Sequence, residues 1–220
     1  MEITWYGHSC FRLTERGSAT VVTDPFDSRY AGYEPLKLRA DIVTISHDSP
    51  GHNFTAGVKG VSHVLDCPGE YEIGGVFITG VQTNGFGKKN EEELRNTLYV
   101  FDYNGITVAH LGDLSHVPSQ TEIEALGTVH VALVPVGGGG GLNSDRAAEV
   151  ISMIVPNFVI PMHYATPDTG DTAKKMDTLS KFIKEMGLSE VQPQPSLKIT
   201  SAANLPEETK VIVLDYQRSV

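Results

Sequence analysis

The segment Ser46-His47-Asp48-Ser49-Pro50-Gly51-His52-Asn53 carries two histidines in a polar stretch punctuated by a proline and a glycine. It follows Ile42-Val43-Thr44-Ile45, an apolar and β-branched run that predicts a buried strand. In α/β sheets, ligands bind beyond the ends of the strands, where loops bring side chains together. We therefore expect His47 and His52 to emerge at a sheet edge and to take part in chemistry.

Two later segments supply further candidates. They are Leu111-Gly112-Asp113-Leu114-Ser115-His116 and Ile160-Pro161-Met162-His163-Tyr164. With the 46–53 segment, and in the same order, they resemble the metallo-β-lactamase superfamily, whose loop motif is His-x-His-x-Asp-His. The resemblance places Asp113 at the strand-end aspartate that bridges two metals, and His163 at the last histidine motif.

The loop departs from that motif at two positions. His47 and His52 hold the first and last positions, but Ser49 stands where the second His belongs and Gly51 where the Asp belongs. The loop length is unaltered. If the two residues are simple replacements of ligands, the double change Ser49→His and Gly51→Asp should strengthen metal binding.

Three more segments narrow the resemblance to one branch of the superfamily. Trp5–Phe11 and Thr23–Phe26 resemble the branch of ascorbate-6-phosphate lactonase and related metal-dependent hydrolases, and Cys67–Gly75 marks a subgroup of it. The resemblance implies an α/β fold, a four-layer αββα sandwich with the site at one sheet edge. The whole chain, residues 1–220, is expected to form a single domain.

The superfamily's two-metal site implies a ligand count that this chain meets only in part. The first metal position keeps His47 and the bridging Asp113. The second keeps His52, Asp113 and His163, and lacks the aspartate that Gly51 replaces. Two histidines and one carboxylate suffice for a catalytic ion with an open position. We therefore predict one divalent ion, zinc or manganese, or none.

Two functions remain open. In the first, a bound ion lowers the pKa of water toward ~7 for attack on a small ester, lactone or phosphoester. Asp113 would then orient the water or accept its proton, and His8 and His116, which flank the site in the resemblance, are candidate acids. In the second, the protein is a metal-free pseudoenzyme that keeps the pocket and acts as a ligand-binding or regulatory module.

Two glycine-containing segments also bear on the site. Gly137–Gly141 is a run of five glycines after an apolar strand, and such backbone approaches ligands closely. It predicts an open pocket. Gly85–Glu93 is polar and predicts a surface loop. Relatives carry a histidine ligand near this loop, where the chain has Asn84 or Gly85.

Composition limits the class of protein and its partners. The chain has 220 residues, 17 Lys and Arg against 27 Asp and Glu, and a formal net charge of −10. Such a charge disfavours nucleic acid, so a small-molecule substrate or ligand is expected. No segment resembles a signal peptide or a membrane span, and two cysteines suit a reduced cytoplasmic protein. A homo-oligomer remains open.

The expected elements are strands in the first half and mixed elements in the second. Asn143 or Ser144 should cap a helix that ends before Pro156. A second helix should start at Asp171 or Thr172. Its core face would carry Met176, Leu179, Phe182, Ile183 and Met186. The predicted strands are 2–6, 10–13, 19–23, 41–45, 76–81, 96–103, 106–110, 129–136, 158–161, 197–199 and 211–214.

Overall fold

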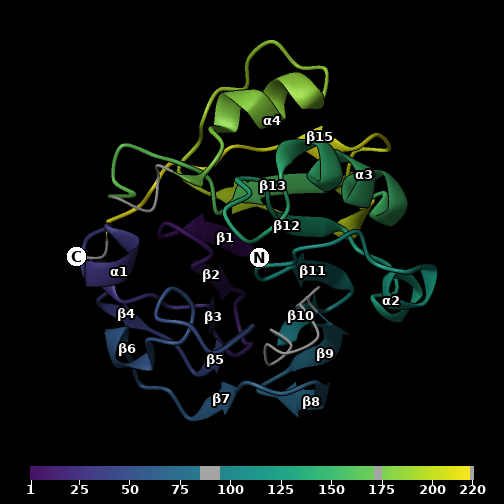
Figure 1. Cartoon of the computed structure of the whole chain (residues 1–220). Coiled ribbons are helices and arrows are strands. Elements are labelled where there is room, and N and C mark those ends of the chain that lie inside the picture. The colour runs from purple at the N-terminus through teal and green to yellow at the C-terminus, as the bar shows by residue number, and fades with distance from the viewer. Residues whose placement is uncertain (85–94, 171–174, 219–220) are drawn as a thin grey trace.

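Two β-sheets face each other across the main hydrophobic core (Figure 1). The computed structural model describes residues 1–84, 95–170 and 175–218. The first sheet has the order β14-β1-β2-β3-β5-β7. Its strands are β1 (Glu2–Trp5), β2 (Phe11–Thr14), β3 (Val21–Thr23), β5 (Ile42–Thr44), β7 (His63–Leu65) and β14 (Leu197–Lys198).

The second sheet has the order β15-β13-β12-β11-β10-β9-β8. Its strands are β8 (Gly69–Ile73), β9 (Val76–Asn84), β10 (Arg95–Tyr103), β11 (Ile106–His110), β12 (Val131–Pro135), β13 (Phe158–Met162) and β15 (Lys210–Val211). Strands β11, β12, β13 and β15 run parallel, as do β3, β5 and β7 of the first sheet. The carboxyl ends of parallel strands meet at one sheet edge, and this places the loops that follow them together.

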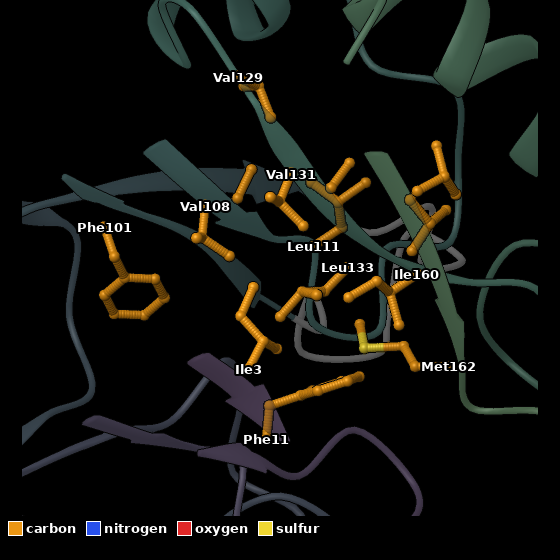
Figure 2. Packing of buried hydrophobic residues seen from close by; sticks show 14 of the residues in the cluster. Ile3, Phe11, Phe101, Val108, Leu111, Val129, Val131, Leu133, Ile160 and Met162 are labelled. Atoms are coloured by element: carbon orange, nitrogen blue, oxygen red, sulfur yellow. The ribbon is translucent and has the colours of Figure 1, made fainter. Parts of the chain in front are cut away.

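Alternation along the strands separates two layers of core. Val21 and Ile42 belong to the cluster between the sheets, whereas their neighbours Val22 and Val43 belong to a second cluster. Side chains of adjacent strand residues point to opposite faces, so the second cluster covers the outer face of the first sheet. Figure 2 shows residues of the cluster between the sheets, among them Ile3 and strand residues of the second sheet such as Val108.

Helices and a small sheet cover the outer faces. Helices α3 (Ser144–Ile154) and α4 (Leu179–Glu185) pack together on the second sheet, and α2 (Gln120–Ala125) lies at its side (Figure 1). Residues of α1 (Ser28–Ala31) and of the pair β4 (Leu38–Arg39) and β6 (Val58–Lys59) cover the first sheet. Short 3-10 turns span Thr55–Gly57 and Ala202–Asn204. In the described part of the chain, every helix is too short or too polar to cross a membrane.

The expected helix near residue 171 begins later than predicted. Residues 171–174 lie outside the described residues, as does the predicted surface loop after Asn84, and α4 begins only at Leu179. Asp177 donates its N–H to Gly137 O (2.6 Å) and accepts the N–H of Ala165 (2.9 Å). These bonds hold the segment before α4 against the loops at the sheet edge. Met176 consequently lines a pocket there and does not join the predicted core face.

The C-terminus of α3 carries a strained residue. Val155 follows the helix with φ 51° and is 70% exposed. A β-branched residue is disfavoured in this left-handed conformation, which glycine adopts freely.

The change Val155→Gly should therefore raise the free energy of unfolding, by about 0.5–1 kcal/mol after the added entropy of the unfolded chain is subtracted. Urea denaturation measures it. Glu149→Gly is the matched control, because Glu149 is exposed inside the same helix. There a glycine should lower stability by about 1 kcal/mol. A loss of stability in Val155→Gly would contradict the strain assigned to this position.

Candidate metal centre

The residues of the candidate site all follow the ends of strands. Asp24 comes directly after β3, His47 three residues after β5, Asp113 three residues after β11, and His163 directly after β13. His8 lies in the turn between β1 and β2. Two of these strands belong to the first sheet's parallel part and two to the second's, so the site forms where both sheets end.

One pocket of about 440 Å³ collects these side chains. The structure brings together in it His47, His52, Asp113 and His163, as well as His8. Its complete lining is His8, Tyr30, His47, Ser49, His52, Asp113, Gly139, His163, Lys175 and Met176. Segments that are far apart in the sequence therefore meet in a cavity of the size that binds small molecules.

Asp24 is a central residue of the site that sequence analysis did not single out. It is fully buried, and its carboxylate accepts the backbone N–H (2.8 Å) and the hydroxyl (2.6 Å) of Ser46. His52 Nδ1 lies 2.7 Å from the same carboxylate. Burial alone would raise the pKa of Asp24, but the charge of His110 and the hydrogen bond from His52 lower it to about 2. The signals in the sequence were its position directly after a buried strand and its place in the Thr23–Phe26 segment, which resembles the hydrolase branch.

The ionised Asp24 fixes the tautomers of two histidines. Because a carboxylate only accepts hydrogen bonds, the His52 Nδ1 atom carries a proton and donates it to Asp24. Ser46 donates its single hydroxyl proton to Asp24, so it accepts from His47 Nδ1 at 3.0 Å. Both rings are left with a lone pair on Nε2. A carboxylate behind a histidine is the usual arrangement around a bound metal.

Burial also lowers the pKa of His8, His47 and His163. Desolvation, helped by the charges of His163, His52 and His47, holds the pKa of His8 well below its usual range. Desolvation and the neighbouring His52 lower the pKa of His47 to about 4, and desolvation lowers the pKa of His163. Metals bind the neutral form of imidazole, so these rings need no deprotonation to act as ligands near neutral pH.

Two groups of three side chains in the described residues could each hold an ion. One is His8, His52 and His163, and the other is His47, His52 and Asp113. In each group the ligand atoms lie within 4.8 Å of one another. Neither group is the predicted set His52, Asp113 and His163. In that set, His163 Nδ1 lies 3.7 Å from Asp113 Oδ1.

The two groups share His52, which limits how many ions they can hold. Its Nδ1 atom is used by Asp24, so only Nε2 remains for a metal. One nitrogen lone pair binds one ion. The two groups therefore cannot both complete three protein ligands at the same time.

The backbone is strained at the same place. Among the described residues, five that are not glycine have positive φ, and three of them are His8 (51°), Asp24 (39°) and His163 (53°). Residues other than glycine persist in this region only where their surroundings enforce it, and such residues cluster at functional sites.

The five-glycine run packs against two residues of the site, His163 and Asp113. A Cβ at Gly137 would collide with the carbonyl oxygen of His163, and one at Gly141 with the carboxylate of Asp113. Only Gly139 of the run lines the pocket. The glycines therefore let this loop pack closely against His163 and Asp113.

The loop of residues 46–53 is more than a motif with two ligands removed. A Cβ at Gly51 would lie 2.8 Å from His8 Nε2 and 3.0 Å from Tyr30 Cε1. The ligand pair that Ser49→His with Gly51→Asp is predicted to restore therefore also requires the His8 ring to shift. The space for the aspartate is taken by the His8 ring.

Four histidines lie outside the pocket lining, namely His63, His110, His116 and His130. His116, a predicted acid, lines a different pocket with Arg146, and its Nε2 is 3.9 Å from Glu122. The structure does not bring it into the lining of the first pocket. His110, which sequence analysis left aside, is fully buried beneath the site with Nε2 2.9 Å from Ser9 O.

Known proteins are similar to this chain in sequence and in fold. The model of the family described as Beta-lactamase superfamily domain matches residues 2–163. A UPF0173 protein of Pyrococcus furiosus is 27% identical over 200 residues, which cover 82% of this chain and 91% of that protein. A UPF0173 metal-dependent hydrolase of Thermoplasma acidophilum is 29% identical over 195 residues, covering 76% and 85%.

Solved structures extend the comparison. A proposed Zn-dependent hydrolase of the metallo-β-lactamase superfamily from Thermotoga maritima is 37% identical, with a TM-score of 0.77 over 97% of this chain and 98% of that one. A metallo hydrolase of Ignicoccus hospitalis has a TM-score of 0.63 at 20% identity, covering 90% and 99%. The second likeness is one of fold alone.

Removing the Asp24 carboxylate should destabilise the protein. The change Asp24→Ala leaves Ser46 N–H and His52 Nδ1–H buried without an acceptor, which should lower the free energy of unfolding by about 3 kcal/mol. Denaturant titration measures it. Asp27→Ala is the control, since Asp27 caps α1 and pairs with the exposed Arg29. Its loss should cost about 1 kcal/mol. Equal losses would show that Asp24 has no special role.

Proposed function

Since the chain belongs to the β-lactamase superfamily domain family, we propose that it is a metal-dependent hydrolase with one divalent ion, zinc or manganese. The candidate residues for holding it are His47, His52, Asp113 and His163, together with His8, and His52 belongs to both groups of three that could hold an ion. The observation that carries the proposal is the meeting of four histidines and a carboxylate in one pocket.

The donors present suit such an ion. Buried polar atoms normally have hydrogen-bond partners, and exceptions call for an explanation. Within the described residues, Asp113 Oδ1 and His163 Nδ1 are buried and without a hydrogen bond. Imidazole nitrogen with carboxylate oxygen is a ligand set that zinc and manganese accept. An ion at this position would lower the pKa of water and polarise a carbonyl or phosphoryl oxygen.

The protein's own side chains supply the remaining requirements of hydrolysis. Asp113 stands at the pocket with one unpaired oxygen, where it can orient a water molecule or accept its proton. Tyr30 and Met176 line the pocket and would contact apolar parts of a substrate. Lys175 also lines the pocket and favours a negatively charged group. We propose a small ester, lactone or phosphoester as the substrate, with an anionic group.

Metal content tests the proposal directly. Protein purified without chelators and supplemented with zinc or manganese should contain one ion per chain by elemental analysis. His52→Ala should lose at least about 90% of it, because His52 belongs to both candidate ligand groups. His63→Ala is the matched control, since His63 is exposed on β7 and does not line the pocket. Two ions per chain would contradict a single site, and none would favour the metal-free module.

Substrate charge provides a second test, with nitrophenyl esters and phosphodiesters as probes. Lys175→Ala should raise KM for anionic substrates about fivefold, which corresponds to about 1 kcal/mol, and leave kcat nearly unchanged. Neutral esters should show no such change. Lys184→Ala is the control, since Lys184 is exposed on α4 and does not line the pocket. An equal effect on neutral and anionic esters would remove the proposed role of Lys175.

A further inference from the structure

His8 is a buried histidine whose two ring nitrogens have no hydrogen-bond partner among the described residues. Its side chain lies in the pocket, and the residue is 4% exposed. Burying a polar group without a partner costs free energy. In a pocket lined by other histidines, an ion is a partner that would offset this cost.

The backbone holds the His8 ring toward two of these histidines. The carbonyl oxygen of His8 accepts the Trp5 Nε1–H at 3.0 Å and the His163 N–H at 3.2 Å. The ring centroid of His8 lies 4.1 Å from that of His163 and 4.9 Å from that of His52. His8 and His163 both have positive φ, and the hydrogen bond from His163 N–H to His8 O joins these two strained positions.

Gly51 makes the room that the ring needs. A Cβ at this position would lie 2.8 Å from His8 Nε2, so a side chain at residue 51 requires the His8 ring to shift. The loop departs from the superfamily motif at Gly51, and the ring that enters the vacated space carries a nitrogen donor. The absent carboxylate and the present imidazole are therefore linked by sterics.

We propose that the ion is held by His8, His52 and His163, with His8 taking the place of the aspartate that Gly51 lacks. Three histidines with a fourth position open to the pocket form a catalytic zinc arrangement. All three side chains are buried, whereas in the rival group His47 and Asp113 are only partly buried. Among the described residues, both ring nitrogens of His8 lack a hydrogen-bond partner, so either is available to an ion. Asp113 is then not needed as a ligand and can accept a proton from water.

This proposal rests on the proposed function, because it assigns ligands to the same ion. The test compares zinc affinity, measured by competition with a chromophoric chelator, in wild type, His8→Asn and His47→Ala. Asparagine tolerates positive φ, so the turn at residue 8 should keep its conformation. His8→Asn should weaken zinc binding about 100-fold, because it removes a nitrogen that contacts the ion, and His47→Ala should weaken it by less than about threefold.

X-ray absorption of the zinc-loaded wild type adds a readout that needs no variant. Three imidazoles around the ion are expected, and two imidazoles with a carboxylate would overturn the proposal. Circular dichroism and thermal unfolding of metal-free His8→Asn show whether the variant folds. If it does not fold, the absorption spectrum alone decides.

An exchange of residues tests the steric link between positions 8 and 51. Glycine suits the φ of residue 8, so His8→Gly removes the ring and leaves room at residue 51. Gly51→Asp should weaken zinc binding in wild type, but in the His8→Gly background it should regain at least about tenfold, because ligands in contact do not act additively. An equal effect of Gly51→Asp in both backgrounds would contradict the shared space.

The outcomes separate this proposal from the function it rests on. Zinc binding that survives in His8→Asn and is lost in His47→Ala places the ion at the rival group, which overturns the role of His8 and leaves the hydrolase proposal standing. Failure of wild type to bind either zinc or manganese overturns both.

Discussion

The carboxylate of Asp24 is buried where the first sheet ends, and it accepts hydrogen bonds from the backbone and hydroxyl of Ser46 and from the His52 ring. A buried charge is tolerated only when such partners surround it. The network orients the loop after β5 and directs the free nitrogens of His47 and His52 away from Asp24. The site's chemistry therefore begins with a residue that is itself no candidate ligand.

The two sheets contribute to the site in different ways. Strands β3 and β5 deliver Asp24 and the histidine loop, whereas β11 and β13 deliver Asp113 and His163. The connection between the sheets is short, since His163 donates its N–H to the carbonyl of His8. Gly137 and Gly141 let the loop after β12 pack against His163 and Asp113. Backbone contacts, more than side-chain pairs, thus set the spacing of the donors.

The two groups of candidate ligands share the imidazole of His52, and this limits how they can bind metal. With Nδ1 of His52 committed to Asp24, the described donors divide into two groups that compete for a single nitrogen. The loss of an aspartate at residue 51 is coupled to the position of His8. A site that looks incomplete when ligands are counted along a motif becomes a compact set of buried histidines when counted in space.

Much of this could be read from the sequence. The apolar runs predicted most strands, Asn143 and Pro156 predicted the bounds of α3, and the spaced His and Asp segments predicted the superfamily. These features are local, since periodicity and capping act within a few residues. The predicted start of α4 was too early, because backbone hydrogen bonds of Asp177 with Gly137 and Ala165 hold the residues before Leu179 out of the helix.

Only the tertiary structure decided which donors meet. His8, His52 and His163 are separated by 44 and 111 positions, and the roles of Asp24 and Gly51 depend on the strands that pack beside them. A sequence states which side chains are available to bind an ion. The distances between those side chains, their burial and the space that one leaves for another arise only when the two sheets are packed together.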